Sequence, residues 1–193
     1  YCIRWEDHKG KTVYREPLSW DEALENQVIK RVRQGIGQWQ QQGWIPDWRI
    51  QDGLETGRLL RERGWTYWHH LFNSRQLLLA ALINQSTDAR LKFGFGRALN
   101  QNARLSRWNY ALGNDKVETV FDNQALNTLY NYGTRGSSYA GDLLLAEFKS
   151  LPIGQVVTQV TCRTAREHDQ PCDLFITDPP YGDAVKYEEI LDF

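Results

Sequence analysis

The spacing of apolar residues changes near residue 150, and the change divides the chain into two kinds of structure. Before it, apolar side chains recur every three or four residues, which is the period of an amphipathic helix. After it, "GQVVTQVTCRT" (154–164) is rich in β-branched residues and "LFIT" (174–177) is continuously apolar, and both patterns are typical of strands. We therefore predict the α/β fold class, with a mainly helical region over 1–150 and part of an α/β sheet over 151–193.

The helical region contains several segments with recognisable start and stop signals. Ser19 is a good N-cap because acidic residues follow it in the first turn, and Asn73 can cap a later apolar run in the same way. Pro46 disfavours helix at the residue before it, so a loop is expected there. The predicted helices cover 19–43, 56–63, 73–102 with a break, 117–132, and a last one that starts at 183.

Chain ends and cysteines limit the class of protein. The chain begins without Met and stops a few residues into a new amphipathic pattern, so we interpret it as a piece of a longer protein. We predict a cytoplasmic location because no apolar stretch approaches the roughly 18 residues of a membrane span and no signal peptide opens the chain. The three cysteines are odd in number and far apart, which argues against a disulfide framework.

Two histidine-containing patterns were considered as metal sites. Cys2 and His8 could be the tail of a zinc ribbon that lies upstream, but no C-x-x-C accompanies them, so a free thiol and a surface histidine are the preferred interpretation. The adjacent His69 and His70 lie in an aromatic run and are expected to be a packed or half-exposed pair. We predict no metal site within the chain.

A stretch without acidic residues, 89–114, is a candidate surface for nucleic acid. The net charge of the whole chain is only −1, yet this window holds five basic residues and no Asp or Glu, with aromatic residues between them. Such a stretch can hold phosphates and stack bases, whereas the alternative is a solvated helix face whose aromatics serve the core. The candidate residues are Arg90, Lys92, Arg97, Arg104 and Arg107.

The sequence "TDPPY" follows the second predicted strand directly. The carboxyl ends of strands in open α/β sheets are where such folds place ligands, and Asp178 offers carboxylate acceptors there. Pro179 and Pro180 fix their φ angles and donate no N–H, so nearby carbonyls are held as further acceptors, and Tyr181 supplies a flat ring. Acceptors beside an aromatic ring suit an exocyclic amino group on a base. The alternative interpretation of this motif is purely structural: a connection from a strand to a turn, with the tyrosine in the core.

This motif resembles the D-P-P-Y motif of the amino-methyltransferases. Together with "WTYWHHLFNSRQLLLAALI", "RLSRWN" and "VFDNQALNTLYNYG", it resembles the adenine-specific DNA methylases that carry an N-terminal domain of unknown function, some with a zinc ribbon. The resemblance covers most of the chain from Trp65 onward. It implies a Rossmann-like methyltransferase sheet preceded by a largely helical insertion for target recognition.

The resemblance also implies roles for particular residues. Asp178 and the Pro179 carbonyl would accept hydrogen bonds from the target amino group, and Tyr181 would stack on a flipped-out base. In that family the S-adenosyl-L-methionine loop precedes the region seen here, so the resemblance implies a main cofactor loop before this chain. "KFGFGRA" is not expected to be that loop, since its spacing is wrong and it follows a helix, and Thr164 is a candidate for touching the cofactor. Gly182 departs from the second aromatic residue expected there. A non-catalytic nucleic-acid-binding module, or a methyltransferase acting on RNA or protein, remains as an alternative.

Overall fold

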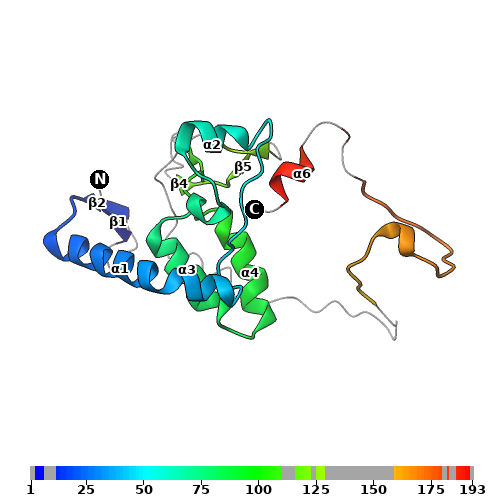
Figure 1. Cartoon of the computed structure of the whole chain (residues 1–193), viewed down its shortest axis with the longest axis horizontal. Coiled ribbons are helices and arrows are strands. Elements are labelled where there is room, and N and C mark those ends of the chain that lie inside the picture. The colour runs from blue at the N-terminus through cyan, green and yellow to red at the C-terminus, as the bar shows by residue number, and fades with distance from the viewer. Residues whose placement is uncertain are drawn as a thin grey trace. The chain divides into compact units, whose positions relative to one another are not determined.

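The computed structural model describes residues 3–6, 12–109, 116–122, 125–128, 159–179, 182 and 186–191. The chain divides into two units, Tyr1–Ala146 with Lys186–Phe193, and Glu147–Val185. Helices and short strands are mixed in the chain (Figure 1), and the strands of the described residues pair as three separate two-stranded ladders. A parallel sheet of the predicted kind is not formed among these residues. None of the helices in the described part has the length and apolarity that a membrane span requires.

The first unit begins with a β-hairpin that the sequence analysis did not predict. Strands β1 (Ile3–Glu6) and β2 (Thr12–Arg15) are antiparallel, and Ile3 lies opposite Arg15. The hairpin leads into helix α1 (Ser19–Gln41), which confirms the long predicted helix.

The N-cap of α1 is Leu18, so the prediction that Ser19 is the N-cap was wrong. The reason is that the N–H of Leu18, the residue before the helix, donates to the Asp21 carboxylate at 2.8 Å, and not to Ser19. Asp21 also accepts two hydrogen bonds from Arg15, at 2.6 and 3.0 Å. The end of β2 is thereby joined to the start of α1.

Helices α2 (Gly57–Arg63), α3 (Ser74–Asn84) and α4 (Ala89–Leu99) confirm the next predictions, including the break between the last two. Asn73 caps α3 as expected: its side chain accepts from the Gln76 N–H at 3.0 Å, and Gln76 Oε1 accepts from the Asn73 N–H at 2.8 Å. Helix α2 ends at Gly64, whose φ of +66° is the left-handed conformation that favours glycine. Local signals therefore define the start of α3 and the end of α2.

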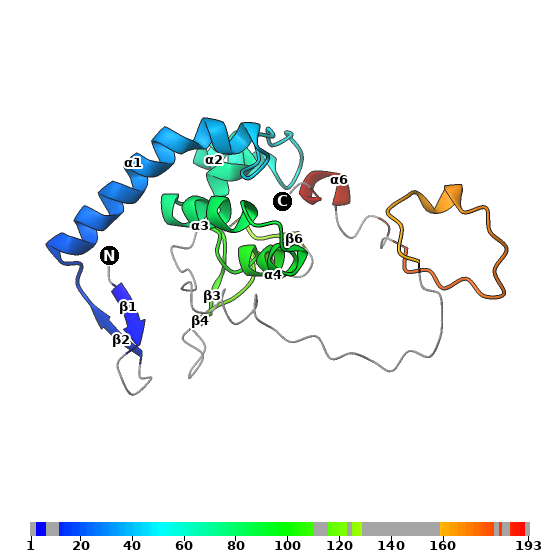
Figure 2. The ribbon, with the colours of Figure 1, turned by 90° about the horizontal axis from the view of Figure 1, so that it is seen from below.

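The helices of the first unit surround a common core. Helix α3 contacts both α1 and α4 (Figure 1, Figure 2), and a 3₁₀ turn, η1 (Trp68–Leu71), leads into it from α2. Side chains that are almost completely buried come from every part of this region. They are Ile45, Leu59, Leu71, Ala81, Leu105, Val117 and Val120.

The predicted helix over 117–132 was wrong as far as the structure describes it. The described residues form β4 (Lys116–Val117), β5 (Phe121–Asp122) and β6 (Ala125–Leu126), with β4 pairing to β3 (Trp108–Asn109). Tertiary contacts explain the difference, because the Asn100 side-chain oxygen accepts from the Val120 N–H at 2.8 Å and the Phe121 N–H at 3.3 Å. The rest of the predicted helix, 129–132, lies outside the described residues.

The second unit is described over 159–179 and 182. It contains the 3₁₀ turn η2 (Ala165–Glu167), in the stretch predicted to be a loop. The predicted strands are not formed at 159–164 or 174–177, which are irregular and exposed, whereas 154–158 lies outside the described residues. A strand exists only where a second backbone completes its hydrogen bonds, and no described segment does so here. In the first unit, the last predicted helix is confirmed over α6 (Tyr187–Ile190).

Candidate functional site

The D-P-P-Y motif lies in the exposed, irregular segment of the second unit. Asp178 and Pro179 are both exposed, whereas Pro180 and Tyr181 lie outside the described residues. No described residue forms a hydrogen bond or ion pair with the Asp178 carboxylate. Gly182 has a φ of +44°, in the left-handed region where glycine is favoured, which explains why an aromatic residue does not occupy this position. The carboxylate is therefore open to a ligand.

The apolar run before the motif is uncovered. The exposed fractions are 73% for Leu174, 65% for Phe175 and 87% for Ile176. Three consecutive apolar side chains with this exposure are unusual on a protein surface, since contiguous apolar patches mark places where another element docks. Within the described residues the only ring contact of Phe175 is edge-on with His168, at 5.6 Å between ring centroids.

A histidine and a cysteine lie close together beside this run, which the sequence analysis did not anticipate. His168 Nε2 is 3.1 Å from Cys172 Sγ, and Arg163 approaches the other ring nitrogen of His168 at 3.2 Å. Because the guanidinium can only donate, Nδ1 is an acceptor and the ring proton lies on Nε2, directed at the sulfur. No group of three or more side chains able to hold a metal ion is found in the described part of the chain.

Thr164, the predicted cofactor contact, is exposed at the start of η2. Its carbonyl oxygen accepts from the Glu167 N–H at 3.0 Å, and no described side chain bonds its hydroxyl. The contact with a cofactor stays a prediction.

The five basic residues of the acid-free window do not share one environment. Lys92 and Arg97 are exposed on α4, and the side chain of Arg90 lies outside the description. Arg104 is half-buried, with its guanidinium carbon 5.6 Å from the centre of the Trp65 ring. Arg107 is half-buried too, and its carbonyl accepts from the Glu118 N–H at 2.7 Å. Two exposed cations thus remain on α4 for an outside partner.

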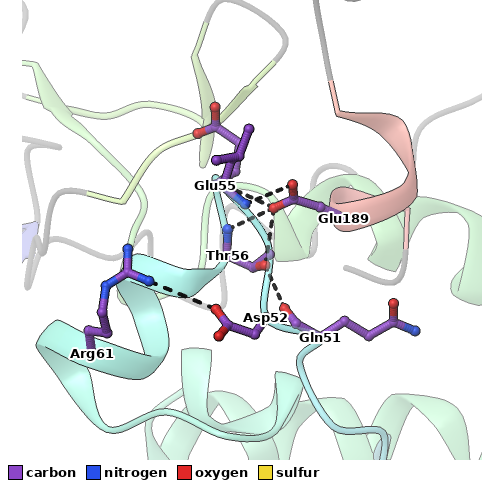
Figure 3. A network of polar contacts seen from close by, with 7 residues as sticks. Gln51, Asp52, Glu55, Thr56, Arg61 and Glu189 are labelled. Carbon is purple, nitrogen blue, oxygen red and sulfur yellow. Dashed lines mark hydrogen bonds and ion pairs between the residues drawn. The ribbon is translucent and has the colours of Figure 1, made fainter.

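The chain that follows the motif is anchored in the first unit by Glu189 of α6 (Figure 3). Its carboxylate accepts from three successive backbone N–H groups, those of Leu54 at 2.9 Å, Glu55 at 2.8 Å and Thr56 at 3.0 Å. The Thr56 hydroxyl lies 3.1 Å from the same carboxylate and 2.6 Å from the Gln51 carbonyl oxygen. A hydroxyl has one proton, so the shorter contact to Gln51 is its donated bond.

These contacts cap the turn over 54–56, which leads directly into α2. Thr56 is the N-cap residue, but its own side chain does not cap the helix. Burial opposes ionisation of Glu189, but the N–H donors of Thr56, Glu55 and Leu54 outweigh it, so the pKa of Glu189 is lowered. A distant carboxylate therefore does what a local cap does in most helices.

Gly53 leaves the space that this carboxylate occupies. A Cβ atom at Gly53 would overlap the carboxyl group of Glu189. The φ of Gly53 is not in the left-handed region, so the reason for glycine here is close approach and not backbone conformation. Nearby, Asp52 and Arg61 form an exposed ion pair at 3.8 Å.

Compared with known proteins, the chain matches no family model, no curated protein and no solved structure. Its function therefore has to be inferred from its residues and their geometry.

Proposed function

We propose that the chain is part of an S-adenosyl-L-methionine-dependent amino-methyltransferase that acts on N6 of adenine in DNA. The observation that carries the proposal is the sequence T-D-P-P-Y behind an apolar run, with the Asp178 carboxylate exposed and unbonded within the described residues. A carboxylate that is exposed and has no partner among the described residues, next to two prolines, is poorly explained as a turn that serves only the fold.

The uncovered apolar run supports a sheet at this place. Leu174, Phe175 and Ile176 expose between 65% and 87% of their surface. Strands of parallel sheets are buried on both faces and read as continuous apolar runs. We propose that this run becomes a strand of a Rossmann-like sheet, at whose carboxyl edge Asp178 would then lie.

In this proposal the residues of the motif position the target amine. The exocyclic nitrogen of adenine is a weak nucleophile because its lone pair is delocalised into the ring. Hydrogen bonds from its N–H groups to Asp178 and to the Pro179 carbonyl favour a more tetrahedral nitrogen and orient its lone pair. Tyr181 holds the base by stacking after it leaves the duplex.

The described residues do not by themselves form a cofactor site. Among the described residues, exposed Thr164 is the only candidate contact, and the glycine-containing stretch 92–98 lies within α4 rather than after a strand. Bound S-adenosyl-L-methionine would supply an electrophilic methyl group. We expect its main binding loop outside this chain.

The proposal is tested with the intact protein and labelled S-adenosyl-L-methionine, offered DNA, RNA and protein in parallel. Label should enter DNA at adenine N6, and Asp178→Ala should abolish this while DNA affinity stays within about twofold. Asp173→Ala is the matched control, because Asp173 is exposed in the same segment. Label in RNA or protein alone would overturn the target, and no label in any of them would favour the non-catalytic module.

The aromatic ring and the hydroxyl of Tyr181 can be separated by substitution. Base stacking on an aromatic ring is worth about 1–3 kcal/mol, so Tyr181→Ala should lower kcat/KM by roughly 5- to 150-fold. Tyr181→Phe keeps the ring and should stay near the wild-type rate. Equal losses in both variants would show that the hydroxyl, not the ring, carries the function.

A further inference from the structure

A group of basic and aromatic side chains lies on the first unit, where the loop after α1 meets the segment before α3. Two short segments run antiparallel there: the Ile50 N–H donates to the Thr66 carbonyl at 2.9 Å, and Arg49 pairs with Tyr67. Arg104 joins the group, since its backbone N–H donates to the Leu71 carbonyl at 2.8 Å. We call the group the histidine–arginine surface; it consists of Arg49, Tyr67, His69, His70 and Arg104.

Rings and guanidinium groups form a continuous cluster on this surface. The Arg49 guanidinium carbon lies 5.9 Å from the centre of the Tyr67 ring. His69 stacks with Tyr67 at 5.5 Å between ring centroids, and His70 meets His69 edge-on at 4.6 Å. Arg49 is exposed, and the other four members are half-buried. These contacts connect Arg49 with the rings of Tyr67, His69 and His70, whereas the Arg104 guanidinium lies over the Trp65 ring.

The hydrogen bonds of the two histidines define which ring nitrogens face outward. His69 Nδ1 lies 3.1 Å from the Pro46 carbonyl oxygen and 3.4 Å from Gln40 Nε2. The carbonyl can only accept and is the nearer partner, so we place the proton of neutral His69 on Nδ1, and Gln40 Nε2 donates to the Pro46 carbonyl at 3.2 Å instead. His70 Nδ1 accepts from the Thr66 N–H at 3.2 Å, so its proton is on Nε2. Neither Nε2 atom has a hydrogen-bond partner among the described residues. His70 therefore presents a donor, and His69 presents one once it is protonated.

Acidic residues hardly compensate this charge. Burial lowers the pKa of both histidines, and the neighbouring His69 and Arg104 lower that of His70 further. The one carboxylate that raises the pKa of a member is Asp47, which faces His69. The permanent charges of the group are those of Arg49 and Arg104, and an anion beside them would favour the charged forms of the two histidines.

We propose that the histidine–arginine surface binds phosphate groups of a DNA backbone, in addition to any phosphate contacts made by the exposed cations of α4. The choice of DNA as the partner rests on the proposed function, whereas the assignment of the surface as a binding site rests on its geometry. Two guanidinium groups with imidazole donors between them suit phosphate oxygens, which accept several hydrogen bonds at once. Arg104 belongs to this surface and not with Lys92 and Arg97.

The proposal predicts that DNA binding takes up protons. A phosphate beside the two histidines favours their charged forms and so raises their pKa values from the lowered values of the free protein. Binding should therefore tighten as pH falls from about 7.5 to 5.5, by up to about tenfold per pH unit for each proton taken up. In nuclear magnetic resonance titrations of the full 193-residue chain, both histidines should titrate at higher pH with a DNA duplex present.

The second measurement is the DNA affinity of variants that lack one charge. It is obtained from the fluorescence anisotropy of a labelled duplex at several salt concentrations. Arg49→Gln should weaken binding on all sequences and make the slope of log K against log salt shallower by about 0.9. Arg33→Gln is the matched control, because Arg33 is exposed on α1; it should leave affinity and slope unchanged. Because His70 also bonds the backbone, the histidine titrations use the unmodified chain, so a folding defect cannot imitate the result.

Three outcomes would overturn the inference. Unchanged histidine pKa values on adding DNA would show a purely structural cluster. Equal effects of Arg33→Gln and Arg49→Gln would show general surface charge. Equal binding of polyglutamate or inorganic phosphate at matched ionic strength would show a nonspecific anion surface. If the binding results are as expected but no methyl group is transferred to DNA, the proposed methyltransferase function is wrong and the proposed phosphate-binding surface still stands.

Discussion

Replacing Glu189 by alanine should release the turn over 54–56 while leaving the rest of the first unit folded. The variant leaves three backbone N–H groups without their acceptor, at distances of 2.8 to 3.0 Å in the wild type. Losing an N-cap acceptor costs about 0.5–2 kcal/mol, and the half-exposed position of Glu189 lets water replace part of the loss. We expect a local cost of about 1–2 kcal/mol.

Hydrogen exchange measured residue by residue is the suitable assay, because a local opening changes little in a global unfolding curve. A cost of 1–2 kcal/mol should speed exchange of the Leu54, Glu55 and Thr56 amides by about 5- to 30-fold. Glu188→Ala is the control, since Glu188 is the exposed neighbour on the same helix. Wild-type exchange rates at all three amides in Glu189→Ala would refute the capping role.

Acid should have the same effect as the substitution. The pKa of Glu189 is lowered in the folded protein, so its contribution is complete above the ordinary value of about 4.3 and is lost as pH falls through the folded value. Gly53→Ala gives an independent route, because the added methyl group occupies the position of the carboxyl group. Protection of the three amides that persists in Gly53→Ala would contradict the close approach.

Two further predictions concern the helices. Gly37→Ala should raise the free energy of unfolding by up to about 1 kcal/mol, because nothing lies within 4 Å of the added Cβ. Gly35→Ala should lower the free energy of unfolding, because its Cβ would meet Trp39 ring carbons at 2.5 and 2.6 Å. Urea unfolding of the two variants compares them directly. Asn73→Ala should cost about 1 kcal/mol in the same assay through loss of the bond to the Gln76 N–H, and Ser74→Ala should cost less than half as much.

The helices that the sequence predicted correctly are those with local end signals. Asn73 and Gln76 bond each other across one turn, and Gly64 ends α2 in a conformation that few other residues adopt. Such contacts involve residues within a few positions of each other, so the pattern that predicts the helix is also the structure that stabilises it.

The errors arise where distant residues decide the conformation. The segment around Val120 has apolar residues at helical spacing, yet Asn100 binds its backbone and burial of Val117 and Val120 favours a ladder. The strand predicted over 174–177 lacks a second backbone among the described residues. At the candidate site, the role that the sequence predicts for Asp178 stays a prediction. The contacts of Glu189 were not predicted, because no local pattern links residues that lie more than 130 positions apart.

The cap of α2 also has a consequence for the order in which the protein is made. Glu189 is synthesised 133 residues after Thr56, and at 5–20 residues per second this takes roughly 7 to 27 s. Through that interval the turn over 54–56 lacks the acceptor for its N–H groups, and the seven-residue helix α2 that it leads into is marginal without outside contacts. On the ribosome, the N–H groups of the turn over 54–56 therefore stay open to competing acceptors until Glu189 has been made.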